Sequence, residues 1–328
     1  MIGSIEISVV VPVYACESSL PELHRRLTDS LDWTDGSYEL VFVEDRGPDC
    51  SWKTLRDLAA RDPRVRAFRL SRNFGQHIAI TAGLAQTRGR WVVVMDCDLQ
   101  DPPEEVRRLY AKASEGYEIV LARRSRKRAS LFRRLASSTY FGLMNMFAGT
   151  SIDPGHGSFS IISRKVVDAY LKFKDRDRHY LFVLYWLGFD RASIEYGHAE
   201  RATGKSSYTF RRLLSHAVGG VFFQTTVLLR WVVNVGFLLA LLGVGAAIYF
   251  AVARISGNAY PGWTSLAVLL LVLGGLIIIS TGVTGLYIGR IFNEVRERPL
   301  FVIDETTEGA GEPIAAPARE ERSPAESR

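Results

Sequence analysis

The sequence predicts an α/β fold, in which a mainly parallel, doubly wound sheet precedes two long apolar segments. Three observations support this prediction. Short apolar runs alternate with helix-like segments over residues 7–122, the apolar run at 92–95 ends abruptly in carboxylates, and two uncharged apolar stretches occupy residues 231–253 and 260–289. Strands that alternate with helices form parallel sheets, because each return to the same sheet needs a crossover connection.

The expected elements follow one another regularly. Strands are expected at residues 7–13, 38–43, 65–70, 91–95 and 118–122, and helices at residues 20–31, 51–61 and 76–87. Pro21 lies near the start of the first helix and Gly89 follows the third, and both are favoured at those positions. Residues 129–147 and 208–229 mix basic and apolar side chains, which predicts amphipathic helices at a membrane surface. The tail at 304–328 has the composition of a disordered segment.

Two apolar stretches, residues 230–253 and 262–289, are each long enough to cross a bilayer, which needs about 20 residues. Arginines gather at and beyond their outer ends: Arg211 and Arg212 precede the first stretch and Arg230 begins it, and Arg290, Arg296 and Arg298 follow the second. Only Arg254 lies in the loop between them. The positive-inside rule therefore predicts a multi-pass inner (plasma) membrane protein with its main domain at 1–207, a return segment at 290–303, and both termini in the cytoplasm. The short apolar run at 7–13 lacks a basic leader, so no secretory signal is expected.

The net charge of +6 is concentrated in a basic cluster at 123–128, followed by Arg133 and Arg134. Beside a predicted membrane anchor, this cluster favours an anionic lipid or a phosphorylated substrate over nucleic acid, with a solvated basic loop as the alternative. Cys16, Cys50 and Cys97 are odd in number and lack paired spacing. They predict reduced thiols, with neither a disulfide framework nor a zinc site.

Three carboxylates, Asp96, Asp98 and Asp101, follow the strand expected at 91–95. Asp96 and Asp98 point the same way because side chains alternate along a strand, and they lie at the sheet edge where ligands usually bind. Their oxygens suit Mg²⁺ or Mn²⁺, which bridges protein acids and substrate phosphates, so a nucleotide diphosphate is the expected ligand. The alternative is an acidic turn in which Asp101 caps the next helix at Pro102.

Polar side chains also follow the other strands: Tyr14 and Glu17, Glu44 and Asp45, and Arg72 and Asn73. Together they predict a nucleotide crevice along one edge of the sheet. The sequence contains no Gly-x-Gly-x-x-Gly or Walker loop, which disfavours hydride transfer and ATP hydrolysis.

The chain resembles glycosyltransferase family 2, and within it the polyprenyl-phosphate glycosyltransferases such as dolichol-phosphate mannose synthase and the bacterial undecaprenyl-phosphate glucosyltransferases. Five segments carry the resemblance: VVPVY at 10–14, SRNFGQ at 71–76, DCDLQDPPE at 96–104, RATGKSSY at 201–208, and residues 290–299 after the apolar stretches. It implies a Rossmann-like, A-type glycosyltransferase fold. It also implies inverting transfer of a sugar, glucose from UDP-glucose being the expectation, to a polyprenyl phosphate such as undecaprenyl phosphate, by a protein that resembles homo-oligomeric relatives.

The same resemblance assigns roles to particular residues. Those expected around the base and ribose are Pro12, Tyr14, Glu17 and Asp45. Asp96 is expected at the nucleotide, and the metal ligands are expected to be Asp98 and Gln100, with Asp96 beside them. Phosphate groups are expected to face Arg123, Arg134, Ser138, Arg201 and Lys205, with Arg133 as the alternative to Arg134.

Some positions depart from the family pattern. Ala15 and Cys16 replace a usual Asn-Glu pair, Glu44 replaces the first acid of a common Asp-Asp pair, and SFS at 158–160 replaces a frequent Asp-Phe-Arg. Asp153 is compatible with either a sugar pocket or a turn cap. No role is assigned to His156, His179 or His198.

Two other functions remain open at this point. A processive polysaccharide synthase shares the nucleotide-binding fold, but it usually has more spans and a Gln-x-x-Arg-Trp motif, a spacing that residues 224–231 do not supply. A non-catalytic membrane scaffold that binds nucleotide sugars is disfavoured by the metal-binding acids and the arginines.

Overall fold

The computed structural model describes residues 5–35, 37–124, 153, 155–173, 175, 178–197, 227–256, 262–296 and 298–308. These residues form two units. The first contains a sheet and its covering helices, and the second contains two long helices, α9 (Val227–Ile255) and α10 (Trp263–Val295).

The described part of the first unit has one eight-stranded mixed sheet of order β7-β5-β6-β4-β1-β2-β3-β8. Its strands are β1 (Ile7–Val13), β2 (Tyr38–Glu44), β3 (Val65–Leu70), β4 (Trp91–Val94), β5 (Ile119–Arg124), β6 (His156–Ser163), β7 (Arg191–Tyr196) and β8 (Ile303–Thr306). The pairs β1–β2, β1–β4, β2–β3 and β5–β7 are parallel. The pairs β4–β6, β5–β6 and β3–β8 are antiparallel. The sheet is therefore mainly parallel, as predicted, but β6 and β8 run against the other strands.

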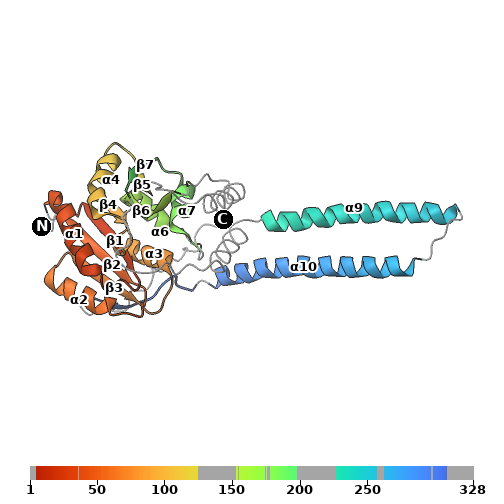
Figure 1. Ribbon diagram of the computed structural model, residues 1–328, viewed down its shortest axis with the longest axis horizontal. Coiled ribbons are helices and arrows are strands. Elements are labelled where there is room, and N and C mark those ends of the chain that lie inside the picture. The colour runs from red at the N-terminus through yellow and green to blue at the C-terminus, as the bar shows by residue number, and fades with distance from the viewer. Residues whose placement is uncertain are drawn as a thin grey trace, which may run out of the picture. The chain divides into compact units, whose positions relative to one another are not determined.

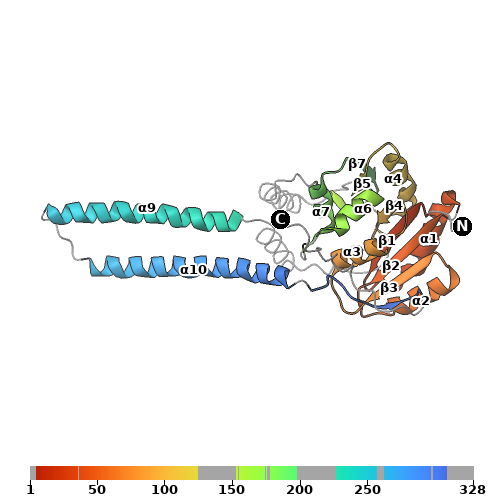
Figure 2. The same ribbon diagram turned by 180° about the vertical axis from the view of Figure 1, so that it is seen from behind.

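Helices cover both faces of this sheet (Figure 1), and Figure 2 shows the same layers from behind. The helices on one face are α1 (Leu20–Leu31), α2 (Ser51–Arg61) and α4 (Val106–Ala113). The short helix η1 (Asp32–Thr34) follows α1, and η2 (Pro103–Glu105) precedes α4. The helices on the other face are α3 (Gln76–Gln86), α6 (Arg164–Leu171) and α7 (Tyr180–Leu187).

The sequence explains these layers simply. All seven residues of β1 are buried, and they alternate between the two cores: Val9 and Val11 face α1, whereas Val10 faces α3. A strand buried on both faces reads as a continuous apolar run. Helix α3 packs so closely on β1 that a Cβ at Gly83 would lie 2.4 Å from Val10 Cγ1. Only glycine fits there without displacing the helix.

A buried charge network ties together the amino ends of the central strands. The Glu39 carboxylate accepts hydrogen bonds from Ser8 Oγ at 2.6 Å, from the Arg88 backbone N–H at 2.6 Å and from Arg66 Nη1 at 2.6 Å. Arg66 also pairs with Glu308, next to β8. The acid and the arginine are each buried but fully matched, which is how a fold tolerates buried charge.

Residues 304–308 differ from the expected disordered tail. Strand β8 pairs with β3, and Glu305 accepts hydrogen bonds from Trp52 Nε1 and Arg69 Nη1, both at 2.9 Å. The prediction was wrong here because these acids find buried or half-buried basic partners that composition does not reveal. Residues 309–328, and the amphipathic segments at 129–147 and 208–226, lie outside the described residues.

The two apolar stretches are helical, as expected, and α10 continues to Val295 into the predicted return segment. Over the residues that the structure describes, no helix is long and apolar enough to cross a membrane.

Candidate functional site

The candidate site lies at the carboxyl edge of the sheet, where the loops after β1, β2 and β4 meet. Three non-glycine residues there have a left-handed backbone: Ala15 (φ 56°), Arg46 (φ 54°) and Leu99 (φ 62°). Such conformations cost free energy and persist only where the surroundings hold them, so they often mark functional loops. Strand β6 runs antiparallel to β4, which brings the start of β6 to this same edge.

Asp96 is at the centre of the site and is held by two side chains. Its Oδ1 accepts hydrogen bonds from Gln76 Nε2 at 2.7 Å and from Ser158 Oγ at 2.9 Å. Burial, followed by the negative charge of Asp101, raises the pKa of Asp96 to about 6. The carboxylate is therefore in surroundings where an added cation would be favourable.

Asp98 and Gln100 follow on the same short loop. The Gln100 backbone N–H donates to Asp98 Oδ1 at 3.1 Å, which fixes the orientation of that carboxylate. Asp96, Asp98 and Gln100 supply hard oxygen donors, which suit a divalent ion shared with substrate phosphates. Among the described residues no group of three His, Cys, Asp or Glu side chains could hold a metal alone. Two carboxylates and an amide completed by a diphosphate fit the chemistry of Mg²⁺ or Mn²⁺ better than an all-protein cage.

Asp101 does not cap the next helix, which was the alternative interpretation. It is fully buried, and its Oδ1 accepts a hydrogen bond from Tyr196 Oη at 2.5 Å. Its Oδ2 is buried and has no hydrogen-bond partner within the ranges that the structure describes. Burial and the adjacent Asp101 raise the pKa of Tyr196, so the phenol stays protonated and donates.

Among the described residues, Arg124 brings a positive charge to these acids. Its Nη2 lies 3.4 Å from Asp101 Oδ1 and its Nε donates to Tyr196 Oη at 3.1 Å. Its charge also lowers the pKa of Asp96. Burial lowers the pKa of Arg124, but Asp101, Tyr196 and Asp96 more than compensate and raise it overall, so the guanidinium stays charged.

Arg123, which the sequence predicted to face phosphate, pairs with two acids in this structure. Its Nε lies 3.0 Å from Asp153 Oδ2 and its Nη1 lies 3.0 Å from Glu195 Oε1, in an exposed ion-pair cluster. Consecutive side chains of a strand face opposite sides of the sheet. A prediction that is wrong by one residue, Arg123 in place of Arg124, therefore names the side chain on the wrong side. Asp153 also accepts the Gly155 backbone N–H at 2.8 Å, which matches the turn-capping alternative.

The residues predicted around the base and ribose lie at the same edge of the sheet, but they differ in exposure and in their hydrogen bonds. Pro12 is buried within β1, whereas Tyr14 is 52% exposed beyond its end. Glu17 Oε2 accepts the Cys50 backbone N–H at 3.2 Å. Asp45 is buried, and its two oxygens accept the backbone N–H groups of Phe74 (2.7 Å) and Gly75 (2.8 Å). Asp45 therefore shapes the loop before α3, and burial raises its pKa despite these two bonds.

The prediction of three reduced cysteines was wrong. Cys16 and Cys97 form a disulfide across 81 residues of sequence, and Cys50 is a free, exposed thiol. Spacing along the chain could not show this pair, because the loops after β1 and β4 become neighbours only when those strands pair.

Four of the predicted phosphate-binding residues lie outside the described residues: Arg134, Ser138, Arg201 and Lys205, together with the alternative Arg133. Sequence reasoning missed the roles of Gln76, Ser158, Arg124 and Tyr196. Gln76 belongs to the SRNFGQ motif, and Arg124 is adjacent to the predicted arginine, so each had a nearby signal. Ser158 and Tyr196 belong to strands that the sequence analysis did not predict.

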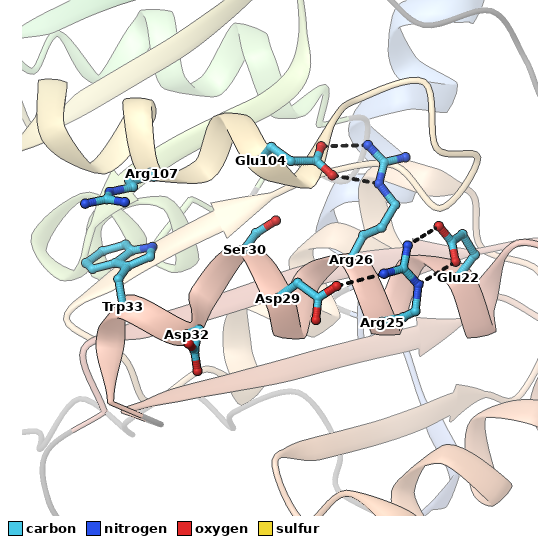
Figure 3. Close-up of a pocket in the computed structure, with 9 residues that line it drawn as sticks. All are labelled: Glu22, Arg25, Arg26, Asp29, Ser30, Asp32, Trp33, Glu104 and Arg107. Atoms are coloured by element: carbon cyan, nitrogen blue, oxygen red, sulfur yellow. Dashed lines mark hydrogen bonds and ion pairs between the residues drawn. The ribbon is translucent and has the colours of Figure 1, made fainter.

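A separate hollow lies on the α1 face, and its lining includes none of the three acids Asp96, Asp98 and Asp101 (Figure 3). Five of its charged side chains form ion pairs: Arg25 with Glu22 at 2.7 Å and Asp29 at 2.8 Å, and Arg26 with Glu104 at 2.6 Å. These pairs are largely exposed and stabilise the surface only weakly. This hollow does not combine buried acids with strained loops, as the carboxyl edge does.

Comparison with known proteins agrees with this geometry. The family described as "Glycosyl transferase family 2" matches residues 8–171. The "Uncharacterized glycosyltransferase YkcC" of Bacillus subtilis is 35% identical over 306 residues, which cover 92% of this chain and 94% of that protein. The "Undecaprenyl-phosphate 4-deoxy-4-formamido-L-arabinose transferase" of Proteus mirabilis is 36% identical over 304 residues, covering 92% and 93%.

Among solved structures, the glucosyl-3-phosphoglycerate synthase of Mycobacterium tuberculosis, in complex with Mn²⁺, UDP and phosphoglyceric acid, is similar at 19% identity with a TM-score of 0.48. The similarity covers 68% of this chain and 80% of that one.

Proposed function

The chain belongs to glycosyltransferase family 2, and on that premise we propose that it transfers a sugar from a nucleotide diphosphate to undecaprenyl phosphate, with inversion at the anomeric carbon. It is a glycosyltransferase with a Rossmann-like, mixed-sheet fold of the A type. One observation supports the proposal most directly: Asp96, Asp98 and the buried Asp101 converge on one sheet edge with Arg124 among them. This site suits a ligand that combines a divalent cation with phosphate groups.

The acceptor follows from the relatives, several of which are named undecaprenyl-phosphate 4-deoxy-4-formamido-L-arabinose transferases. A lipid phosphate is already an anionic nucleophile at neutral pH, so the chain needs no general base. The obstacle is repulsion between two anionic substrates. At 4 Å this repulsion is about 4 kcal/mol per pair of unit charges when the effective dielectric constant is about 20.

Cationic groups must offset this repulsion. We propose that Asp96, Asp98 and Gln100 hold Mg²⁺ or Mn²⁺, which neutralises the leaving diphosphate when bound. Gln76 and Ser158 orient Asp96, and the Gln100 N–H orients Asp98. The Arg124 guanidinium, held by Tyr196 and Asp101, binds a phosphate oxygen through charge-assisted hydrogen bonds. The remaining phosphate contacts are proposed for Arg134, Ser138, Arg201 and Lys205.

The membrane setting is part of the same proposal. Large apolar side chains are exposed along both long helices, among them Phe237 and Leu241 of α9 and Ile277 and Ile278 of α10. Arginines flank the two stretches on the sides predicted to be cytoplasmic. We propose that the protein works at the cytoplasmic face of the inner membrane, where the acceptor's phosphate meets the nucleotide sugar. Fractionation of cells, with carbonate extraction of the membranes, tests the location, and light scattering tests for the homo-oligomer.

A transfer assay tests the reaction itself. Radiolabelled UDP-glucose is the first donor, with UDP-4-deoxy-4-formamido-L-arabinose and GDP-mannose as alternatives, in the presence of undecaprenyl phosphate and Mg²⁺, Mn²⁺ or EDTA. We expect a labelled lipid whose formation EDTA prevents, and NMR should show the inverted anomer. A product of retained configuration, or full activity in EDTA, would contradict the mechanism, and no transfer from any donor would contradict the function.

A further inference from the structure

The disulfide joins the two loops that carry the proposed donor-binding residues. Cys16 lies between Tyr14 and Glu17 after β1, and Cys97 lies between Asp96 and Asp98 after β4. The Cα atoms of the two cysteines are 6.3 Å apart. Neither the family match nor the names of the relatives assign a function to this pair.

The bond lies behind the site and does not block it. Cys97 is 7% exposed and belongs to the core on the α1 face, and Cys16 packs against the same core. Ser19 connects the loops a second time, because its hydroxyl lies within hydrogen-bond distance of the carbonyl oxygens of Cys97 (2.7 Å) and Cys16 (2.9 Å) and can donate to either. This contact does not require the disulfide, so it favours re-formation of the bond after reduction, but it holds the loops less firmly than the covalent link does.

We propose that Cys16 and Cys97 are a reversible thiol–disulfide pair whose oxidised form binds the nucleotide diphosphate more tightly than the reduced form. This inference rests on the proposed function for its ligand. Its oxidant is a low-molecular-weight disulfide. Cys16 reacts first, because it is half-buried whereas Cys97 is buried.

The exchange is balanced. The Cys16 thiolate attacks one sulfur of the small disulfide and releases one small thiolate, leaving a mixed disulfide. The Cys97 thiolate then attacks the Cys16 sulfur and releases the second small thiolate. The two protein thiols lose two electrons, the small disulfide gains them, and the two protons from the cysteines pass to the released thiolates.

The effect on affinity follows from the ordering of the loops. Ala15 and Leu99, one on each loop, have the left-handed backbone that a non-glycine residue rarely adopts. A cross-link between the loops holds both of them near the bound geometry before the donor arrives. In the reduced protein, binding must order the loops against their own preference, so we expect about three- to tenfold weaker binding.

The first experiment counts thiols in the full-length protein. The protein is incubated with oxidised or reduced glutathione, denatured, alkylated and weighed by mass spectrometry. After oxidation Cys16 and Cys97 should escape alkylation and Cys50, which is exposed, should be either alkylated or bound to one glutathione; after reduction three alkylated cysteines are expected. In the matched control Cys50→Ser the numbers become zero and two. Three alkylated cysteines in the oxidised wild type would overturn the proposal.

The second experiment measures the Kd of UDP and of GDP, each with Mn²⁺, by calorimetry in both redox states. We expect reduction to weaken binding in the wild type and in Cys50→Ser, and to leave Cys16→Ser unchanged at the weaker value. Equal affinity in the two wild-type states would refute the coupling. If neither nucleotide binds in either state, the proposed donor class is wrong. The ordering of the two loops by the Cys16–Cys97 bond is then tested by amide hydrogen exchange at residues 14–19 and 96–101. Exchange that does not slow on oxidation would end the proposal.

Discussion

Neighbouring arginines on β5 offer a direct test of the candidate site. Arg124 lies among the buried acids, whereas Arg123 pairs with Asp153 and Glu195 on an exposed surface. We expect Arg124→Ala to reduce sugar transfer strongly and Arg123→Ala to leave it within about twofold of the wild type, because exposed ion pairs contribute at most about 1 kcal/mol. The control differs from the test by one position in the sequence.

The size of the effect follows from the contacts of Arg124. A hydrogen bond to a charged group contributes about 1.5–3 kcal/mol, and about 1.4 kcal/mol corresponds to a factor of ten. Loss of one guanidinium–phosphate contact in the transition state should therefore lower kcat/KM by about 10- to 150-fold. The fold should survive, because Asp101 keeps its 2.5 Å hydrogen bond from Tyr196. We expect a loss of about 1–2 kcal/mol in stability, equivalent to a few degrees in Tm.

The assay is transfer of labelled sugar to undecaprenyl phosphate at saturating and limiting donor, with Tm measured on the same preparations. Arg124→Lys should recover part of the rate, since it restores the charge without the planar fork that binds two oxygens. Equal rates for Arg124→Ala and wild type would refute the role of Arg124. A larger loss for Arg123→Ala would restore the original sequence prediction.

Three further changes probe the metal site, the acid response and the fold. Asp98→Asn should lower transfer by about a hundredfold without changing the circular dichroism spectrum, because it weakens the grip on the divalent ion; a rate near that of wild type would remove Asp98 from the site. Burial lowers the pKa of His77 to about 4 and that of His179 to about 3. Below about pH 6.5 the unfolded chain therefore binds protons at these histidines more readily than the folded chain does. The free energy of unfolding, measured with urea, should fall by about 1–2 kcal/mol per histidine between pH 7.5 and 5. The double variant His77→Gln/His179→Gln should flatten that profile, and an unaltered slope would contradict this assignment. Glu39→Ala should cost about 3–5 kcal/mol, because it leaves the buried Arg66 charge without one of its partners, yet the folded fraction should keep its donor affinity.

The sequence predicted the first half of the sheet well, for a simple physical reason. Helices α1 and α2 and strands β1 and β3 have the predicted bounds, because leucines at helical spacing and runs of Val, Ile and Phe leave little ambiguity. Strands β6, β7 and β8 were not predicted. Strand β7 alternates exposed and half-buried residues at the edge of the described sheet, so it lacks a continuous apolar run.

The sequence predicted the acids of the site but not the residues that form hydrogen bonds with them. Asp96 and Asp98 follow an unmistakable buried strand, and their joint direction follows from the two-residue repeat. Ser158 and Tyr196 bind Asp96 and Asp101 across 62 and 95 residues of sequence, through strands whose direction only the folded sheet reveals. The pairing of Cys16 with Cys97 has the same origin.

Charged side chains are paired differently at the two edges of the described sheet, and this difference bears on where the ligand binds. At the amino edge, the buried Glu39 and Arg66 neutralise each other, and Ser8 Oγ donates a further hydrogen bond to Glu39. At the carboxyl edge, Asp96 and Asp101 share Arg124, Asp101 Oδ2 has no hydrogen-bond partner among the described residues, and the pKa of Asp96 rises to about 6. Within the part of the chain that the structure describes, the carboxyl edge therefore keeps a negative excess, which is what the proposed ligand, a nucleotide diphosphate with its own divalent cation, requires. Bound Mn²⁺ with a nucleotide diphosphate should therefore raise Tm more than either component alone, whereas in Asp98→Asn the combination should add little; equal shifts in the two proteins would show that the excess charge has another cause.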